Sequence, residues 1–161
     1  MKIIISGVPC CGKTFFGDWL RDQHGFAHAN LEERAMPNAL PIPSPDMTVE
    51  LPRWLASVAT HVVVTWGFPP NAYCLDKITR FQDAGFTPWW FAAEYNVARA
   101  RYVALHGQQK TEESFDPQIQ LLEQAQAELT AIYQNYSIET LTAAGRKPVA
   151  EIYDSIVQNT D

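Results

Sequence analysis

Short apolar runs alternate along the chain with segments in which apolar residues recur every three or four positions. The run at 2–6 is rich in β-branched residues, as in a buried strand, and the segment 14–23 gathers its apolar residues on one helical face. By the same patterns we expect strands at 26–29, 61–65, 89–92 and 137–142, and helices at 51–58, 72–84, 95–106, 116–136 and 149–157. This order predicts one α/β domain over residues 1–161, with a five-stranded parallel sheet flanked by helices in three layers.

Three segments interrupt this alternation. Residues 36–48 contain four prolines, so they cannot form a regular helix or a central strand. Residues 107–115 are mostly polar and predict a loop, and residues 143–147 predict a short loop before the last helix. The pair Asp116-Pro117 predicts the start of a helix, because proline is favoured at the first helical position.

A glycine-rich motif lies between the first strand and the first helix. It fits the phosphate-binding P-loop pattern G-x-x-x-x-G-K-[ST], and the order of strand, loop and helix is the one this motif requires. The bare pattern would arise by chance in about one chain of this length in two hundred, so an ordinary glycine turn is disfavoured. We therefore expect nucleotide contacts from Gly7, Val8, Pro9, Cys10, Cys11, Gly12, Lys13 and Thr14, and from the next residue, Phe15.

The chemistry of the motif follows from the groups that it presents. Gly7 and Gly12 permit a tight turn in which successive backbone N–H groups point at a polyphosphate, and the helix that follows adds its positive dipole end. The Lys13 ammonium can reach the β- and γ-phosphates, and the Thr14 hydroxyl can ligate Mg²⁺. The motif therefore predicts ATP and Mg²⁺ as cofactors, with Thr14 as the metal ligand.

Two of the motif residues are cysteines. A thiol near a helix N-terminus can have a lowered pKa and become reactive, which would allow redox control at Cys10 or Cys11. The alternative, which we favour, is that both are small residues whose backbone N–H groups matter more than their sulfurs. The three cysteines and four histidines show no metal-ligand spacing, and we assign no catalytic role to the histidines.

Composition narrows the classes of partner. The formal net charge is -6 and the isoelectric point is near 5.1, which disfavours a nucleic-acid partner because such binding requires clustered Lys and Arg. The sequence has no long apolar run and no signal-peptide pattern, so we expect a cytoplasmic protein without a membrane partner. It does not indicate an oligomeric state.

With these elements in order, the whole chain resembles the P-loop small-molecule kinases of the adenylate kinase, shikimate kinase and gluconate kinase kind. The resemblance implies a P-loop NTPase fold and an ATP-dependent phosphotransferase with a small-molecule acceptor. In such kinases, residues 33–60 would correspond to the acceptor-binding insertion. Residues 107–115 would correspond to a lid loop, and Ala144 would lie in the loop around the adenine base.

The resemblance also implies three catalytic side chains besides Lys13. Glu32 follows the second strand, where these kinases place an acidic residue, and could accept the proton of an attacking hydroxyl. An equally weighted alternative is that Glu32 is a solvated loop charge. Arg99 and Arg101 fall where the family has arginines that clamp phosphates, but they lie about 200° apart on a helix, so we expect at least one to be structural.

One turn departs from the family pattern. Residues 66–70 resemble the Asp-Gly-Phe-Pro-Arg turn of nucleotide monophosphate kinases, but Trp66 replaces its acidic residue and Pro70 its arginine. This departure disfavours a nucleotide monophosphate acceptor and leaves open a module or weak NTPase that changes shape with ATP occupancy. A nucleic-acid 5′-hydroxyl kinase is a third possibility, which the net charge disfavours.

Overall fold

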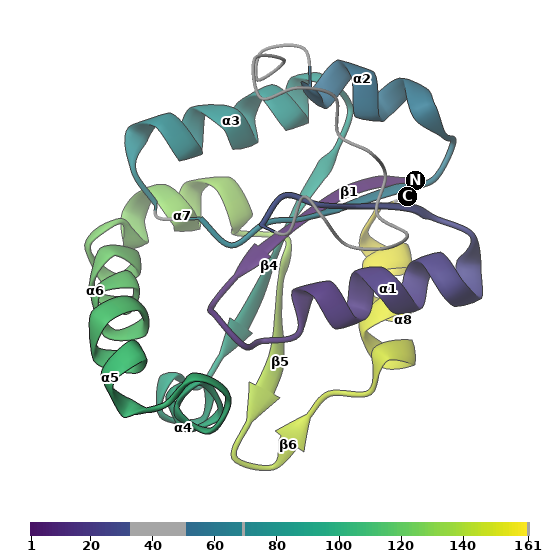
Figure 1. The fold of residues 1–161 in the computed structure, drawn as a ribbon. Coiled ribbons are helices and arrows are strands. Elements are labelled where there is room, and N and C mark those ends of the chain that lie inside the picture. The colour runs from purple at the N-terminus through teal and green to yellow at the C-terminus, as the bar shows by residue number, and fades with distance from the viewer. Residues whose placement is uncertain (33–50, 69, 161) are drawn as a thin grey trace.

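A six-stranded sheet with helices on both faces forms the centre of the molecule (Figure 1). The computed structural model describes residues 1–32, 51–68 and 70–160. The strands lie in the order β2-β3-β1-β4-β5-β6. Their bounds are β1 (Lys2–Gly7), β2 (Ala27–Asn30), β3 (Val62–Thr65), β4 (Thr87–Ala93), β5 (Ser137–Thr142) and β6 (Gly145–Arg146).

The first five strands are parallel, which confirms the expected α/β fold with a parallel core. The expected strand count of five is wrong, because β6 pairs antiparallel with β5 at the edge of the sheet. This sixth strand has two residues within the segment 143–147 that we expected to be a loop. A strand this short has no periodic pattern, and its pairing depends on the turn that precedes it.

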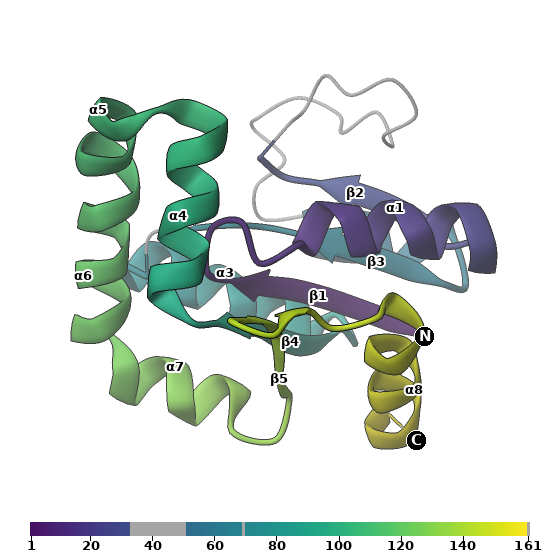
Figure 2. The same ribbon diagram turned by 90° about the horizontal axis from the view of Figure 1, so that it is seen from below.

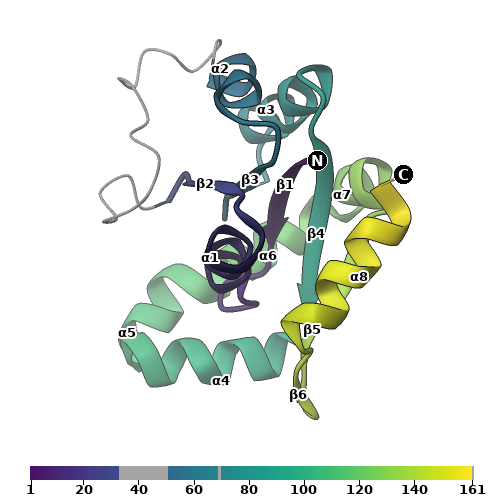
Figure 3. The ribbon, with the colours of Figure 1, turned by 90° about the vertical axis from the view of Figure 1, so that its right-hand side faces the viewer.

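Nine helical segments connect and cover the strands in the described part of the chain. They are α1 (Lys13–His24), α2 (Leu51–Val58), α3 (Ala72–Asp83), α4 (Tyr95–His106), α5 (Gln108–Lys110), η2 (Thr111–Phe115), α6 (Asp116–Gln124), α7 (Gln126–Tyr133) and α8 (Val149–Thr160). Helices α1 and α8 lie on one face of the sheet, and α2 and α3 lie on the other (Figures 1 and 2). Helix α4 crosses beyond the carboxyl ends of β4 and β5 (Figure 3).

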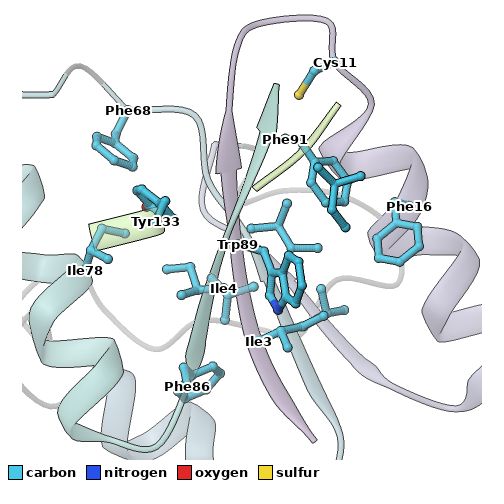
Figure 4. Packing of buried hydrophobic residues seen from close by; sticks show 14 of the residues in the cluster. Ile3, Ile4, Cys11, Phe16, Phe68, Ile78, Phe86, Trp89, Phe91 and Tyr133 are labelled. Atoms are coloured by element: carbon cyan, nitrogen blue, oxygen red, sulfur yellow. The ribbon is translucent and has the colours of Figure 1, made fainter. Parts of the chain in front are cut away.

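The core lies on both faces of the central strands. The runs 3–5 in β1 and 62–64 in β3 are fully buried, as expected for parallel strands covered by helices on both sides. Phe16 of α1 packs against Phe91 of β4 with ring centroids 5.4 Å apart, and this contact ties the helix after the P-loop to the sheet (Figure 4). Each such buried side chain contributes about 1.5–3 kcal/mol of hydrophobic stabilisation.

The segment 107–115 differs from the loop that its polar composition predicts. It is helical, with α5 followed by the five-residue π-helix η2, and two exposed pairs four residues apart, Gln108–Glu112 and Gln109–Glu113, are hydrogen-bonded. The side chains of Thr111 and Phe115 are buried, so one face of the segment is anchored. Composition alone missed these local pairs and anchors.

The following helix differs in part. It begins at Asp116 with Pro117 in its first turn, as the pair predicts, although Phe115 before it already has helical backbone angles. The single helix expected at 116–136 is two helices, α6 and α7, which separate at Ala125. In the expected acceptor insertion 33–60, residues 33–50 lie outside the described residues, whereas the helix expected at 51–58 is confirmed as α2.

Helix α1 packs on β2 through a glycine in the middle of the helix. A Cβ atom at Gly17 would lie 2.6 Å from Cε1 of His28, so only glycine leaves room for this buried imidazole. The ring approaches Asp18 Oδ1 through Nδ1 at 3.1 Å and Thr65 Oγ1 through Nε2 at 2.9 Å. The glycine is therefore explained by a contact between α1, β2 and β3.

We expect Gly17→Ala to destabilise the protein by about 1–3 kcal/mol, because the methyl group displaces the His28 ring. In an exposed helix the same change would stabilise by up to about 1 kcal/mol. Urea unfolding checks this, with Gly17→Ala combined with His28→Ala as the control, since the smaller side chain restores the space. Stabilisation by Gly17→Ala alone would contradict the packing described.

Candidate functional site

A cleft of about 480 Å³ opens between the P-loop, the start of α1 and helix α4. It brings together eight of the residues expected from the sequence: Pro9, Cys10, Gly12, Lys13, Thr14, Phe15, Glu32 and Arg101. The P-loop joins the carboxyl end of β1 to α1, and ligands of open α/β sheets bind at this edge. The cleft is therefore the candidate site.

The P-loop backbone has the conformation that its glycines allow. Gly7 has φ 152° and passes so close to the carbonyl oxygen of Phe91 that a Cβ atom would overlap it. Cys10 has φ 64° and is the one non-glycine residue in the described part of the chain with positive φ. Val8 and Cys11 are 1% exposed, so their side chains fix the loop to the core and do not line the cleft.

Lys13 supplies a buried positive charge at the cleft. It is 7% exposed, and its ammonium donates to the carbonyl oxygens of Gly7 and Val8 at 3.2 Å each. Among residues 1–32, 51–68 and 70–160, no carboxylate lies within ion-pairing distance of it. A buried cation without a counterion is costly, and an anionic ligand in the cleft would compensate it.

Asn30 connects the two polar ends of the site. Its Nδ2 donates to Thr14 Oγ1 at 3.3 Å, and its Oδ1 accepts from the backbone N–H of Glu32 at 3.0 Å. The Glu32 carboxylate in turn accepts from the backbone N–H of Gly67. The hydroxyl expected to bind metal and the carboxylate expected to address the acceptor are thus held by one chain of hydrogen bonds.

The two candidate arginines of α4 have different surroundings. Arg99 forms a bidentate ion pair with Asp116, with Nε and Nη2 each 2.8 Å from a carboxylate oxygen. Arg101 is exposed and lines the cleft. The expectation that the two side chains cannot address one phosphate fits this geometry, in which Arg99 ties α4 to α6.

Arg146 is a cleft residue that we did not single out from the sequence. It belongs to β6, and its guanidinium lies 5.2 Å from the centroid of the Phe15 ring and against Gly12. Its Nε is buried and has no hydrogen-bond partner among the described residues. Only the antiparallel pairing of β6 brings this side chain over the P-loop, and the sequence does not predict that pairing.

Ala144 lies outside the main cleft. It lines a neighbouring hollow of about 310 Å³, together with Thr142 and Lys147. Arg146 lines both hollows and so marks where they adjoin. The role of Ala144 beside a base stays a prediction.

Burial shapes the chemistry of the two P-loop cysteines. It raises the pKa of the Cys10 thiol above its ordinary value of 9.0, although Lys13 opposes the shift. Burial likewise raises the pKa of Cys11, again against the influence of Lys13. Both groups are therefore thiols at neutral pH, which favours the interpretation that they serve the loop through their backbone.

The Thr14 hydroxyl is the group in the cleft that suits a Mg²⁺ ion shared with a nucleotide. In the described ranges, no group of three His, Cys, Asp or Glu side chains could hold a metal ion. The Thr14 hydroxyl at the cleft is a suitable single oxygen ligand, since Mg²⁺ usually keeps several waters and shares phosphate oxygens.

None of the described helices has the length and the apolar character that a membrane-spanning helix needs.

Comparison with solved structures identifies the class of fold. Shikimate kinase from Acinetobacter baumannii in complex with shikimate superposes with a TM-score of 0.63 at 18% identity, over 99% of this chain and 94% of that one. A gluconokinase from Sinorhizobium meliloti 1021 superposes with a TM-score of 0.53 at 18% identity, over 99% of this chain and 90% of that one. The tunicamycin resistance protein of Deinococcus radiodurans superposes with a TM-score of 0.61 at 19% identity, over 98% of this chain and 95% of that one.

These likenesses establish a fold of the P-loop small-molecule kinase kind, as the motif and element order predict. No protein-family model and no curated protein sequence matches the chain. At such low identity the similarity concerns the fold, so the roles of individual residues depend on the geometry of this chain.

The buried His28 predicts a pH dependence of stability. Burial lowers its pKa below the ordinary 6.5, the Arg21 charge adds to this, and Asp18 and Asp22 oppose it. Below pH 6.5 the unfolded chain therefore binds a proton that the folded His28 resists, and stability falls as pH decreases from that point.

As the pH falls from 6.5 to the folded pKa of His28, we expect this residue to lower the free energy of unfolding by at most about 1.4 kcal/mol per pH unit. Urea unfolding at pH 7.5 and 5.5 measures the effect, with His28→Gln as the comparison. The expected result is a smaller loss of stability in the variant. Equal losses in both proteins would show that His28 does not resist protonation.

Proposed function

We propose that the protein is an ATP-dependent phosphotransferase that acts on the hydroxyl or phosphate of a small molecule. The observation that carries this proposal is that Lys13, Arg101 and Glu32 line a single cleft beside the P-loop. Phosphoryl transfer depends mainly on positioning and on stabilising negative charge, so two cations and one carboxylate are a fitting set.

The nucleotide side of the cleft would be formed by the P-loop and Arg146. ATP would supply the phosphoryl group, and Mg²⁺ would neutralise part of its charge. Lys13, already oriented by two carbonyl oxygens, would bind the terminal phosphates, and Thr14 would hold the metal. Arg146 lies against the loop and lines the cleft, so its guanidinium would add positive charge beside the phosphates.

Glu32 would act on the acceptor. The hydrogen bond from the Gly67 N–H orients its carboxylate at the cleft, and Asn30 Oδ1 accepts from its backbone N–H. From there the carboxylate would accept the proton of an attacking hydroxyl. Arg101, which lines the same cleft, would stabilise the charge that develops on the transferring group.

The acceptor side would be completed by residues 33–60. A small molecule fits this arrangement better than a nucleic acid, because the chain carries a net charge of -6. Trp66, directly after β3, follows the strand end at which ligands of such sheets bind. The second candidate function, an ATP-dependent switch with slow or no transfer, is favoured by the absence of a carboxylate at Thr65 and Trp66.

We expect ADP formation from ATP·Mg²⁺ to rise in the presence of the right acceptor. Lys13→Ala is expected to reduce this rate by at least about 100-fold, because the buried ammonium that would contact the phosphates is lost. Pooled nucleosides, nucleotides, sugars, sugar acids and 5′-hydroxyl oligonucleotides serve as acceptors. Lys2→Ala, at the opposite end of β1, is the matched control.

Three outcomes separate the candidate functions. Stimulation by a small-molecule pool supports the proposal, and stimulation by oligonucleotides with steep salt dependence supports a nucleic-acid kinase instead. ATP binding with every pool at the Lys13→Ala rate overturns the kinase assignment and supports the switch.

A further inference from the structure

A chain of three polar side chains, of which His28 and Thr65 are buried and Asp18 is partly exposed, runs from α1 to the carboxyl end of β3. His28 is 4% exposed and Thr65 is 1% exposed, and the ring lies 3.1 Å from Asp18 Oδ1 and 2.9 Å from Thr65 Oγ1. The chain links three separate elements, and Gly17 is the residue that leaves space for its central ring. An apolar side chain could fill the same volume, so the polar groups call for an explanation.

The direction of each hydrogen bond in this chain follows from its ends. The Asp18 carboxylate is an acceptor, and Arg21 also donates to its Oδ1 at 2.7 Å. The imidazole Nδ1 therefore carries the proton, and burial keeps the ring neutral, which leaves Nε2 as an acceptor. The Thr65 hydroxyl then donates its proton to Nε2, so its oxygen offers only lone pairs to any further partner.

Thr65 lies on the strand next to Asn30, the residue that contacts the expected metal ligand Thr14. It pairs in register with Ile5 of β1, two residues before the P-loop begins at Gly7, and with Asn30 of β2. Paired residues of neighbouring strands have their side chains on the same face of the sheet, and the Asn30 side chain contacts Thr14 Oγ1 at 3.3 Å. Thr65 is thus one strand away from the residue that touches the expected Mg²⁺ ligand.

We propose that Asp18 and His28 position the Thr65 hydroxyl as a hydrogen-bond acceptor for the hydration shell of Mg²⁺. Waters on Mg²⁺ donate outward and need acceptors, and in P-loop NTPases a carboxylate near this strand end assists the metal. Here β3 ends in Val-Val-Val-Thr followed by Trp66, and the His28 ring, held by Asp18, orients the Thr65 hydroxyl. The inference rests on the proposed function, because it assigns positioning residues to its metal site.

Nucleotide affinity with and without metal tests this role apart from turnover. Calorimetric titration with a non-hydrolysable ATP analogue, in Mg²⁺ and in EDTA, gives the factor by which Mg²⁺ tightens binding. We expect Thr65→Val to lower this factor at least fivefold while binding in EDTA changes less than twofold. Thr65→Ser, which keeps the hydroxyl, and Thr79→Val, a change on the exposed surface of α3, are expected to retain the factor.

A factor unchanged in Thr65→Val, or affinity lost equally in Mg²⁺ and EDTA, would overturn the inference and leave the three residues a structural role. Nitrogen-15 NMR of the His28 ring in the unaltered protein is independent of how the variants fold. We expect the neutral ring protonated at Nδ1. A ring protonated at Nε2 would also overturn the inference. If the unaltered protein binds no nucleotide at all, the proposed function itself fails, and that result is distinguishable from an unchanged Mg²⁺ factor.

Discussion

The P-loop is held where the backbone of Gly7 passes the carbonyl oxygen of Phe91 in β4. No side chain fits between them, and the N–H of Val8 donates to that same oxygen at 3.3 Å. The loop therefore leaves β1 at a fixed place, and the Phe16–Phe91 contact fixes the helix that follows. The position of Lys13 relative to the cleft depends on both contacts.

Parallel strands collect the remaining groups around this loop. Because β1 to β5 share one direction, their carboxyl ends lie at one edge, and residues distant in sequence meet there. Asn30 and Glu32 arrive from β2, Thr65 from β3, and Arg101 from the helix after β4. The hairpin of β5 and β6 adds Arg146. The site is thus a consequence of sheet topology as much as of the motif.

The parts of the fold that depend on local pattern could be predicted. The buried β-branched strands, the P-loop and the cleft positions of Lys13 and Thr14 follow from periodicity and motif, and that of Glu32 follows from the resemblance to P-loop kinases. The missed features depend on tertiary pairing. Arg146 needs a two-residue antiparallel strand, and the helical form of 107–115 needs the burial of one of its faces.

The hydrogen-bonded chain through His28 was missed for the same reason. Its partners lie 10 and 37 residues away in sequence, and an isolated histidine has no pattern that indicates them. Arg99 illustrates the converse, because family position suggested a phosphate contact whereas its nearest anion is Asp116.

The central claim is that the cleft beside the P-loop binds nucleotide phosphates. Titration of isotope-labelled protein with ATP·Mg²⁺, followed by amide NMR, tests it most directly. The account predicts saturable shifts at the backbone amides of Gly12, Lys13 and Thr14 and at Arg146, with little change in α2 and α3. Shifts confined to other surfaces, or none at millimolar ATP, would contradict it.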